Sequence, residues 1–379
     1  MANKVEFYRH LLGEEEAEEV AQTLDGVFLT AGPRTKQFED WLASYLGVKG
    51  AVGLFSCTTA LFLAMKAMDI GEGDEVITTP MTFIATSNTV LHTGAKLVFV
   101  DCERNTANID LDQVEAAITP RTKAIIPVHL YGHMVDMRKL KAIADKHNLK
   151  IIEDCAHCIE GERDGIKPGQ LGDVACFSFY ATKNMASGEG GAVAGNDMAL
   201  LNRIRSLRTH GMNKEAANRY TATYQHWDML ELGFKGNMFD IQAALLLPQI
   251  KHLEPRRDRR EEICQRYEEA FDALDVDYPV VEPGTKSARH LFTIWVNPAK
   301  RDEVLTGLQQ RGIGVAVNYR AVHLLTYYRE KLGYTRGQYP NAEFVGDSTI
   351  TLPLYPGMTN EQTEIVVDAV RDTLQAVSA

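Results

Sequence analysis

The sequence predicts an α/β protein with a large domain, built on a mostly parallel central sheet flanked by helices, and a smaller C-terminal α/β domain. Between about residues 50 and 200, short apolar runs rich in β-branched residues alternate with segments of helical periodicity. Strands that alternate with helices are typical of βαβ units and a parallel sheet. A break at Pro279 and Pro283-Gly284 then precedes a second group of strand and helix patterns.

The first unit is expected to contain strands at Val76–Thr79, Leu97–Val100, Ala124–Val128, Lys150–Glu153, Val174–Ser178 and Ala192–Ala194. Helices are expected near 58–68, 82–92, 112–118 and 136–147. The first of these helices presents Leu61, Ala64, Met65 and Met68 on one face. Residues 200–227 are polar and show few periodic patterns.

The second unit is expected to begin after a long helix over residues 239–274, whose charged stretch Glu254–Glu262 is interpreted as a solvated face. Strands are expected near 291–297, 313–318 and 349–352. A final helix is expected to start at Thr359, where Thr359 and Gln362 have the spacing of a capping box. We place the boundary near residue 250, which gives domains of residues 1–250 and 251–379.

Composition narrows the class of protein. The chain has 379 residues, of which 45% are hydrophobic and 24% charged, as in ordinary folded domains. Its net charge of −11 makes binding to nucleic acid through overall charge an unfavourable hypothesis. No signal-peptide pattern or run of ~18 apolar residues is present, and the six cysteines are scattered. We therefore expect a cytoplasmic protein with no membrane span.

The segment from Ser178 to Gly191 carries the clearest indication of chemistry. A strand ends at Ser178, Lys183 follows five residues later, and a glycine-rich turn comes next. This spacing places a hydroxyl and an ammonium at the carboxyl end of the sheet, where open α/β sheets bind ligands. A lysine withdrawn from water there acquires a lower pKa and can form a Schiff base. Taken alone, a lysine in a loop is more often a surface residue.

A second segment, from Lys150 to Gly161, runs from an apolar strand into Glu153 and Asp154. An acid at the end of a strand can pair with a cationic ring nitrogen, the usual partner of pyridoxal phosphate (PLP). Helix capping by Asp154 is the alternative. The run Cys155-Ala-His-Cys158 has no second Cys-x-x-Cys, so no metal site is expected.

Two further segments complete the pattern. Hydroxyl residues around Thr58 lead into an amphipathic helix, whose first N–H groups could bind an anion or simply be capped. Phe83, after the next strand, could stack on a flat ring or belong to the core. A phosphate anchor, an aromatic ring, an acid and a lysine thus stand at the ends of successive strands. Together they are what a PLP site needs.

These motifs resemble the DegT/DnrJ/EryC1/StrS family of PLP-dependent aminotransferases, which mostly act on nucleotide-linked keto-sugars. The resemblance implies the PLP-dependent transferase fold type I and extends over nearly the whole chain. Its motifs are Leu29–Pro33, Ser56–Leu61, Pro80–Thr86, Val128–Gly132, Glu153-Asp154, Ser178–Lys183, Arg208–Gly211, Gly233–Ala244 and Leu352–Pro356.

The resemblance implies roles for individual residues. Lys183 matches the lysine that binds the cofactor covalently and moves the proton between amino donor and cofactor. Asp154 matches the acid that pairs with the pyridine nitrogen. Thr58 and Ser178 match the hydroxyls that hold the phosphate, assisted by the N–H of Cys57 or Thr58.

The ring and its surroundings are assigned in the same way. Phe83 matches the aromatic residue stacked on the ring. His157 stands where many members have a glutamine that contacts the 3-oxygen, and its protonation would add a charge there. Asn237 is assigned to the phosphate of the neighbouring subunit's cofactor, a role that some members carry two places earlier, at Lys235 in this chain. The family is typically a homodimer with active sites at the interface.

By the same resemblance, Thr30, Lys235, Arg320 and His323 are expected to approach the substrate. The expected reaction takes the amino group from L-glutamate to a keto-sugar, carried on a nucleoside diphosphate. One branch of the family dehydrates sugars, but there a histidine replaces the lysine, so Lys183 argues against it. An aminocyclitol transaminase and a PLP-binding regulatory protein without catalysis remain alternatives.

Overall fold

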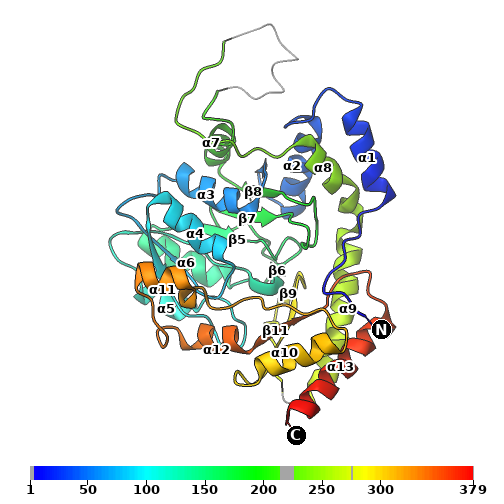
Figure 1. The fold of residues 1–379 in the computed structure, drawn as a ribbon. Helices are drawn as coiled ribbons and strands as arrows, with labels where there is room; N and C mark the ends of the chain where they lie inside the picture. Colours follow the sequence, from blue (N-terminus) through cyan, green and yellow to red (C-terminus); the bar gives the residue numbers. More distant parts are fainter. Residues whose placement is uncertain (1–3, 214–225, 275, 379) are drawn as a thin grey trace.

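A computed structural model describes residues 4–213, 226–274 and 276–378 of the chain (Figure 1). Its centre is a seven-stranded sheet with the strand order β1-β8-β7-β5-β4-β2-β3. The strands are β1 Gly50–Leu54, β2 Glu75–Thr78, β3 Lys96–Phe99, β4 Thr122–Ile125, β5 Lys150–Asp154, β7 Val174–Ser178 and β8 Gly191–Gly195. Only β8 runs antiparallel to its two neighbours, and the other neighbouring pairs are parallel. The mostly parallel sheet is confirmed.

Helices connect these strands where the periodicity predicts them: α3 Cys57–Ala67, α4 Ile84–Thr93, α5 Leu111–Ala116 and α6 Met137–His147. The helices α1 Glu14–Leu24, α2 Pro33–Leu46 and α7 Met198–Leu207 and the strand β1 were not predicted, nor were the two-residue strands β6 and β9 and the helices α10 to α12 described below. Helix α7 overlaps the start of the stretch 200–227 that showed few periodic patterns. Residues 214–225 of that stretch lie outside the described part of the chain.

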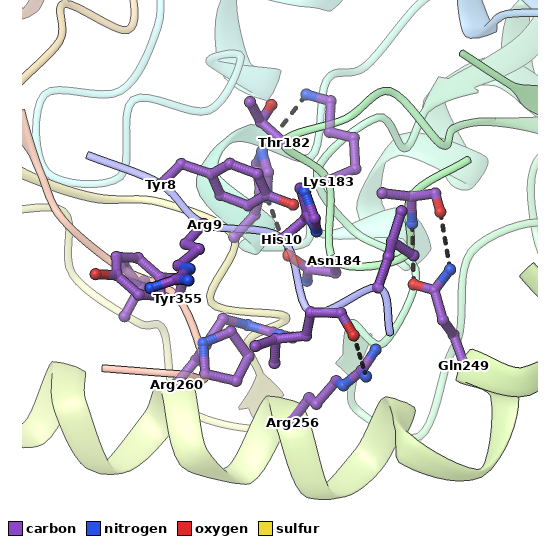
Figure 2. A pocket seen from close by; sticks show the side chains of 16 residues that line it. Tyr8, Arg9, His10, Thr182, Lys183, Asn184, Gln249, Arg256, Arg260 and Tyr355 are labelled. Atoms are coloured by element: carbon purple, nitrogen blue, oxygen red, sulfur yellow. Dashed lines mark hydrogen bonds between the residues drawn. The ribbon is translucent and has the colours of Figure 1, made fainter. Parts of the chain in front are cut away.

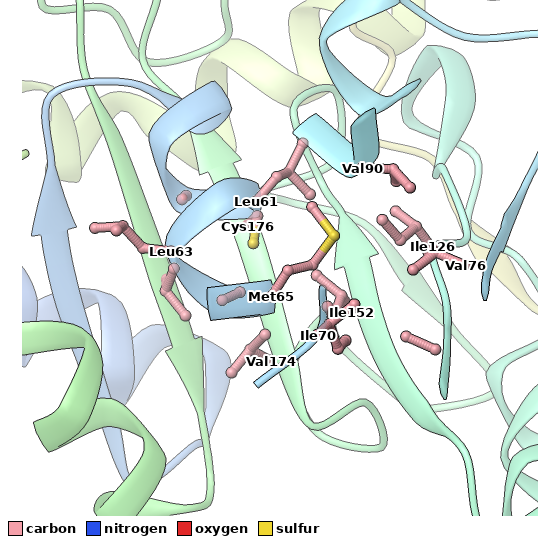
Figure 3. Close-up of a cluster of buried hydrophobic side chains, with 14 of the residues drawn as sticks. Leu61, Leu63, Met65, Ile70, Val76, Val90, Ile126, Ile152, Val174 and Cys176 are labelled. Carbon is pink, nitrogen blue, oxygen red and sulfur yellow. The ribbon is translucent and has the colours of Figure 1, made fainter. Parts of the chain in front are cut away.

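Side chains of the central strands alternate between two core layers. In β7, Val174 and Cys176 pack with α3 on one face, whereas Ala175 and Phe177 pack with α2 on the other. Figure 3 shows the first layer, where Leu61 and Met65 of α3 lie against the sheet. A strand covered on both faces has no polar side, which explains its continuous apolar sequence.

The long helix predicted over 239–274 is wrong in one respect. The segment consists of α8 Asp240–Leu246, a 3₁₀ segment η3 Leu247–His252 and α9 Leu253–Phe271. Pro248 lies at the start of η3, and a proline lacks the N–H that a continuous α-helix would use. The solvated face predicted for Glu254–Glu262 is also wrong at Arg260, which is 2% exposed.

The C-terminal part contains β10 Phe292–Trp295 paired antiparallel with β11 Thr349–Leu352, as predicted. The short strand β9 Thr285–Lys286 pairs with β6 Glu162–Arg163 of the first part. The helices of the C-terminal part are α10 Arg301–Gln310, α11 Thr326–Leu332, α12 Pro340–Ser348 and α13 Asn360–Ser378. Short 3₁₀ turns are η1 Leu130–Gly132 in the first part and η4 Val322–Leu324 in the C-terminal part. Thr359 and Gln362 form the predicted capping box at the start of α13.

The strand predicted at 313–318 is wrong. Ile313 forms a single bridge with Val5, and Ala316 forms one with Thr351. The segment therefore passes between two different partners without a ladder to either. Val5 also packs in the core of the C-terminal part, so the first residues of the chain join its last third. The division at residue 250 stays a prediction. Among the described residues, we find no helix with the length and apolar character needed to span a bilayer.

Candidate active site

The sequence-predicted site residues gather where the strands of the sheet end. Thr58 lies just beyond β1, Phe83 beyond β2, Asp154 at the end of β5, and Lys183 beyond β7. Because these four strands point the same way, their carboxyl ends meet at one edge of the sheet. Cys57, Asp154 and Lys183 lie near one another, and the Asp154 carboxylate raises the pKa of both the Cys57 thiol and the Lys183 amine.

The start of α3 forms an anion-binding geometry. Oγ of Ser56 accepts the N–H of Thr59 over 3.1 Å. The N–H groups of Cys57 and Thr58 lie in the first helical turn, where a helix offers no acceptor of its own. Gly191 at the start of β8 approaches so closely that a Cβ there would stand 2.5 Å from the nitrogen of Cys57. Only glycine permits this approach, which also brings the end of β7 at Ser178 beside the helix.

Asp154 is a buried carboxylate held by its neighbours. Oδ2 accepts the hydroxyl of Thr86 over 2.8 Å, and Oδ1 accepts the N–H of Ala156 over 3.1 Å. Burial raises the pKa of Asp154, although both hydrogen bonds and Lys183 oppose that effect. A buried carboxylate of this kind is stabilised by a cationic partner such as a pyridinium.

Lys183 lies in a loop closed by the hydrogen bond from its own N–H to the carbonyl of Tyr180, 2.9 Å. Burial lowers the pKa of its amine to about 8, while Cys57 and Asp154 act in the opposite direction. Figure 2 shows Lys183 near the N-terminal residues Tyr8 to His10, which line the same pocket. The lowered pKa increases the fraction of this amine that is neutral and nucleophilic near neutral pH.

His157 is buried and makes two hydrogen bonds. Nδ1 accepts the backbone N–H of Tyr131 over 3.2 Å, so Nε2 carries the proton and lies 3.1 Å from the hydroxyl of Tyr319. Burial lowers the pKa of His157 well below its usual range. The ring of Phe83 is 52% exposed and lies 5.7 Å from that of Tyr319. Phe83 is therefore a free aromatic surface and not a core residue.

Two of the residues assigned to shared functions, Asn237 and Lys235, belong to a segment beside the end of β1, where Asn237 forms a bridge with Leu54. Asn237 is 2% exposed, and its Nδ2 donates to Oγ1 of Thr30 over 3.1 Å and to the carbonyl of Met238. It is thus engaged within its own chain, and Thr30 is its partner. Lys235, two residues earlier, is exposed.

The two residues predicted in the segment 318–323 have different surroundings. Arg320 is exposed and follows Tyr319, the partner of His157. His323 is fully buried, with Nε2 3.1 Å from Oε1 of Glu343 and its ring against Tyr339. The structure does not bring His323 into the cluster around Lys183.

Several residues of the site carried no prediction. Thr86 holds Asp154, Tyr319 contacts His157, and His290 contacts Lys183. The spacing of Thr82 and Thr86, one helical turn apart and 2.7 Å between hydroxyls, is a pattern that could have indicated a polar pair. His290 lies in the C-terminal part, and no local pattern connects it to Lys183.

The region around Cys155 does not resemble a metal site in its hydrogen bonding. His129 uses Nε2 on Glu153 over 2.8 Å and accepts the N–H of Val135 at Nδ1. The other oxygen of Glu153 accepts the N–H of Gly169. Burial raises the pKa of the Cys155 thiol well above its usual value, which favours the protonated thiol. The hydrogen bonds of His129 and Glu153 thus connect backbone segments within the core.

The groups at this edge of the sheet fit PLP. They offer first-turn N–H groups for the phosphate, a buried carboxylate for the ring nitrogen, an exposed aromatic face for the ring and an amine of lowered pKa. This fold and site define a PLP-dependent aminotransferase. Residues 10–371 match the model of the DegT/DnrJ/EryC1/StrS aminotransferase family, and the chain belongs to this family.

Individual relatives agree with this assignment. The spore coat polysaccharide biosynthesis protein SpsC of Bacillus subtilis is 44% identical over 372 residues, covering 96% of each chain. Spr1654 from Streptococcus pneumoniae, solved in its PMP form, superimposes with a TM-score of 0.94 at 30% identity and covers 99% of this chain and 100% of its own. Helicobacter pylori PseC, an aminotransferase involved in the biosynthesis of pseudoaminic acid, gives a TM-score of 0.91 at 28% identity, covering 98% and 100%.

Proposed function

We propose that this enzyme transfers the amino group of L-glutamate to a keto-sugar carried on a nucleoside diphosphate, for the biosynthesis of an amino sugar. The observation that carries the proposal is the amine of Lys183, with a pKa of about 8, at the same sheet edge as the buried Asp154. The names of SpsC and PseC, which refer to polysaccharide and pseudoaminic acid biosynthesis, support a sugar acceptor.

When bound, PLP supplies an electron sink for the charge that develops as a proton leaves the carbon beside the amino group. Nζ of Lys183 takes that proton from Cα of the amino donor and delivers it to the cofactor within the same half of the reaction. In the second half the same amine moves a proton in the opposite direction, to the carbon of the sugar acceptor that receives the amino group. Only the neutral amine can accept a proton, so the lowered pKa serves this role.

The remaining residues bind and orient. The Asp154 carboxylate holds the proton on the ring nitrogen, and His157, neutral by burial, contacts the 3-oxygen side. Phe83 covers one face of the ring. The N–H groups of Cys57 and Thr58 hold the phosphate, together with the hydroxyls of Thr58 and Ser178. Arg320 is exposed beside the cluster, and a bidentate guanidinium there suits the diphosphate of the acceptor.

The proposal is tested by incubating the purified enzyme with L-glutamate and a panel of nucleoside-diphosphate keto-sugars. Formation of 2-oxoglutarate together with an amino sugar, identified by mass spectrometry, is the expected result. Release of water from the sugar without amine transfer would contradict it. Production of 2-oxoglutarate without any aminated sugar would support L-glutamate as the donor and contradict the proposed class of acceptor.

We further propose a homodimer with shared active sites. Exposed apolar side chains support this arrangement, including Met229, Leu230 and Leu232, the last 81% exposed. Lys235 follows them in the chain, and its exposed amine suits the phosphate of the partner's cofactor. Asn237, to which the family resemblance gives this role, already donates a hydrogen bond to Thr30 of its own chain.

Mixing two inactive variants tests the sharing. Homodimers of Lys183→Ala lack the amine, and homodimers of Lys235→Glu lack the partner's cation. A mixed dimer retains one site with both wild-type residues, so random mixing is expected to restore about a quarter of the activity. No activity above the sum of the separate variants would contradict a shared site that uses Lys235.

A further inference from the structure

The amine of Lys183 has a hydrogen-bond partner from the C-terminal part of the chain. Nζ lies 3.4 Å from Nε2 of His290, a residue 107 positions further along. His290 is 4% exposed, and its ring lies 4.5 Å from that of His157, centre to centre. In Figure 2, a dashed line beside Thr182 marks the hydrogen bond of the Lys183 amine.

The surrounding hydrogen bonds determine which nitrogen of His290 carries the proton. Nδ2 of Asn184 donates to Oε2 of Glu160 over 2.8 Å and to the carbonyl of Ala288 over 3.0 Å. Oδ1 of Asn184 therefore faces Nδ1 of His290, 3.0 Å away, and must accept from it. Burial lowers the pKa of His290 well below its usual range. The ring is neutral, with Nδ1–H as donor and the lone pair of Nε2 directed at Lys183.

The backbone holds this ring in place at some conformational cost. Arg289, directly before it, has a φ of +46°, and Tyr131, whose carbonyl accepts the N–H of His290 over 3.1 Å, has a φ of +58°. Left-handed conformations are costly for such residues and persist where the surroundings enforce them. Arg289 is fixed by three hydrogen bonds to Glu261 and Glu268 of α9. Strained non-glycine residues of this kind cluster at functional sites.

We propose that His290 is a positioning residue for Lys183: its neutral Nε2 accepts a hydrogen bond from the amine and holds Nζ where it exchanges the proton of the amino donor. The proton exchange itself rests on the proposed function. Lys183 becomes an ammonium after it takes a proton. The lone pair of Nε2 stabilises this ammonium by accepting a hydrogen bond, and the neutral ring adds no charge to the site. The Asn184–Glu160 contacts keep the acceptor in the correct tautomer.

The inference predicts a change in the titration of Lys183. Burial disfavours the ammonium form of Lys183, and the hydrogen bond to His290 favours it. Without this acceptor the pKa of the amine is expected to fall further below about 8. Titratable groups from the surrounding elements face this amine or line its pocket, and they stay unchanged in the test. They are Tyr8, Arg9 and His10 before α1, Cys57 in α3, Asp154 in β5, His157, Arg256 and Arg260 in α9, and Tyr355 before α13.

The test measures acetylation of Lys183 by acetic anhydride in the full chain freed of cofactor, as a function of pH, by mass spectrometry of its peptide. Asparagine places its amide near the position of Nδ1, and glutamine places Oε1 near that of Nε2. His290→Asn and His290→Phe remove the acceptor and are expected to lower the pH of half-maximal reaction by about one unit. His290→Gln keeps an acceptor and is expected to restore the wild-type value.

Wild-type titration in His290→Asn and His290→Phe would overturn the proposal, and so would a His290→Gln that behaves like His290→Phe. Circular dichroism confirms that each variant is folded, and if His290→Phe fails to fold, the asparagine and glutamine pair still decides. In the holoenzyme, His290→Asn is expected to lower kcat about tenfold without changing KM for the donor. Because acetylation requires no turnover, a wrong proposed function would leave its result intact.

Discussion

The hydroxyl of Thr86 donates a hydrogen bond to Oδ2 of Asp154 over 2.8 Å, and that of Thr82 lies 2.7 Å from Thr86. Since Thr86 gives its proton to the carboxylate, Thr82 must donate to Thr86. A chain of two threonines on and before α4 thus orients the carboxylate that we propose as the partner of the ring nitrogen of PLP.

Removing this hydrogen bond tests the role of Asp154. Thr86→Val is expected to raise the pKa of Asp154 further, because one interaction that lowers it is lost, and to weaken PLP binding about tenfold. The dissociation constant is measured by absorbance titration of the cofactor-free chain. Thr89→Val is the matched control, because the Thr89 hydroxyl bonds only a backbone carbonyl one turn away. Equal affinities of the two variants would contradict the assignment.

The lowered pKa of Lys183 makes the stability of the cofactor-free protein depend on pH. The folded amine titrates near 8, and its ordinary value is 10.5. Between these values the unfolded chain binds more protons, so stability rises with pH; the penalty is full below about 8 and gone above about 10.5. In urea unfolding, Lys183→Met is therefore expected to have a higher free energy of unfolding than the wild type at pH 7. At pH 10 this advantage of the variant should be smaller. A difference independent of pH would show that the amine is not perturbed.

His157 is expected to stay neutral throughout the working range of the enzyme. Burial lowers its pKa, and protonation would cost the hydrogen bond from the N–H of Tyr131. The acidic limb of the kcat/KM profile should accordingly be the same for wild type and for His157→Gln. A limb near pH 6.5 that disappears in the variant would instead show that His157 titrates during the reaction.

Arg260 is expected to contribute strongly to stability, although it lies in a stretch of charged residues. It is 2% exposed and pairs with the buried Glu160 over 2.5 Å. Removing one partner of a buried pair costs ~3–5 kcal/mol, against ~0–1 kcal/mol for an exposed pair. Arg266, also on α9, forms an exposed pair with Glu364 and supplies the control. Equal unfolding free energies of Arg260→Met and Arg266→Met would contradict this account.

Local patterns were sufficient for most of the sheet and for the order of the site residues. The predicted strands Lys150–Glu153 and Val174–Ser178 end beside Asp154 and at Ser178, and the geometry of parallel strands required those ends to meet. The break at Pro248 was also readable in principle, since proline interrupts a helix. The strand β1 was missed because Gly50–Leu54 is short and contains two glycines.

Contacts between distant parts of the chain could not be predicted in this way. Arg260 appears in a run that looks solvated, and only its contact with Glu160 explains its burial. His290 meets Lys183 through the packing of the C-terminal part, which no periodicity describes. The burial of His323 against Glu343 likewise depends on how α12 packs. Sequence patterns determine elements locally, whereas these pairs depend on tertiary packing.

The most direct test of the central claim is the visible absorbance of the PLP-loaded enzyme before and after addition of L-glutamate, beside Lys183→Ala. The wild-type band is expected to change to that of the pyridoxamine form as 2-oxoglutarate appears, and Lys183→Ala is expected to show no turnover. A wild-type protein that binds PLP but leaves glutamate unchanged would contradict the proposed donor. Normal amino transfer by Lys183→Ala would contradict the role of Lys183 itself.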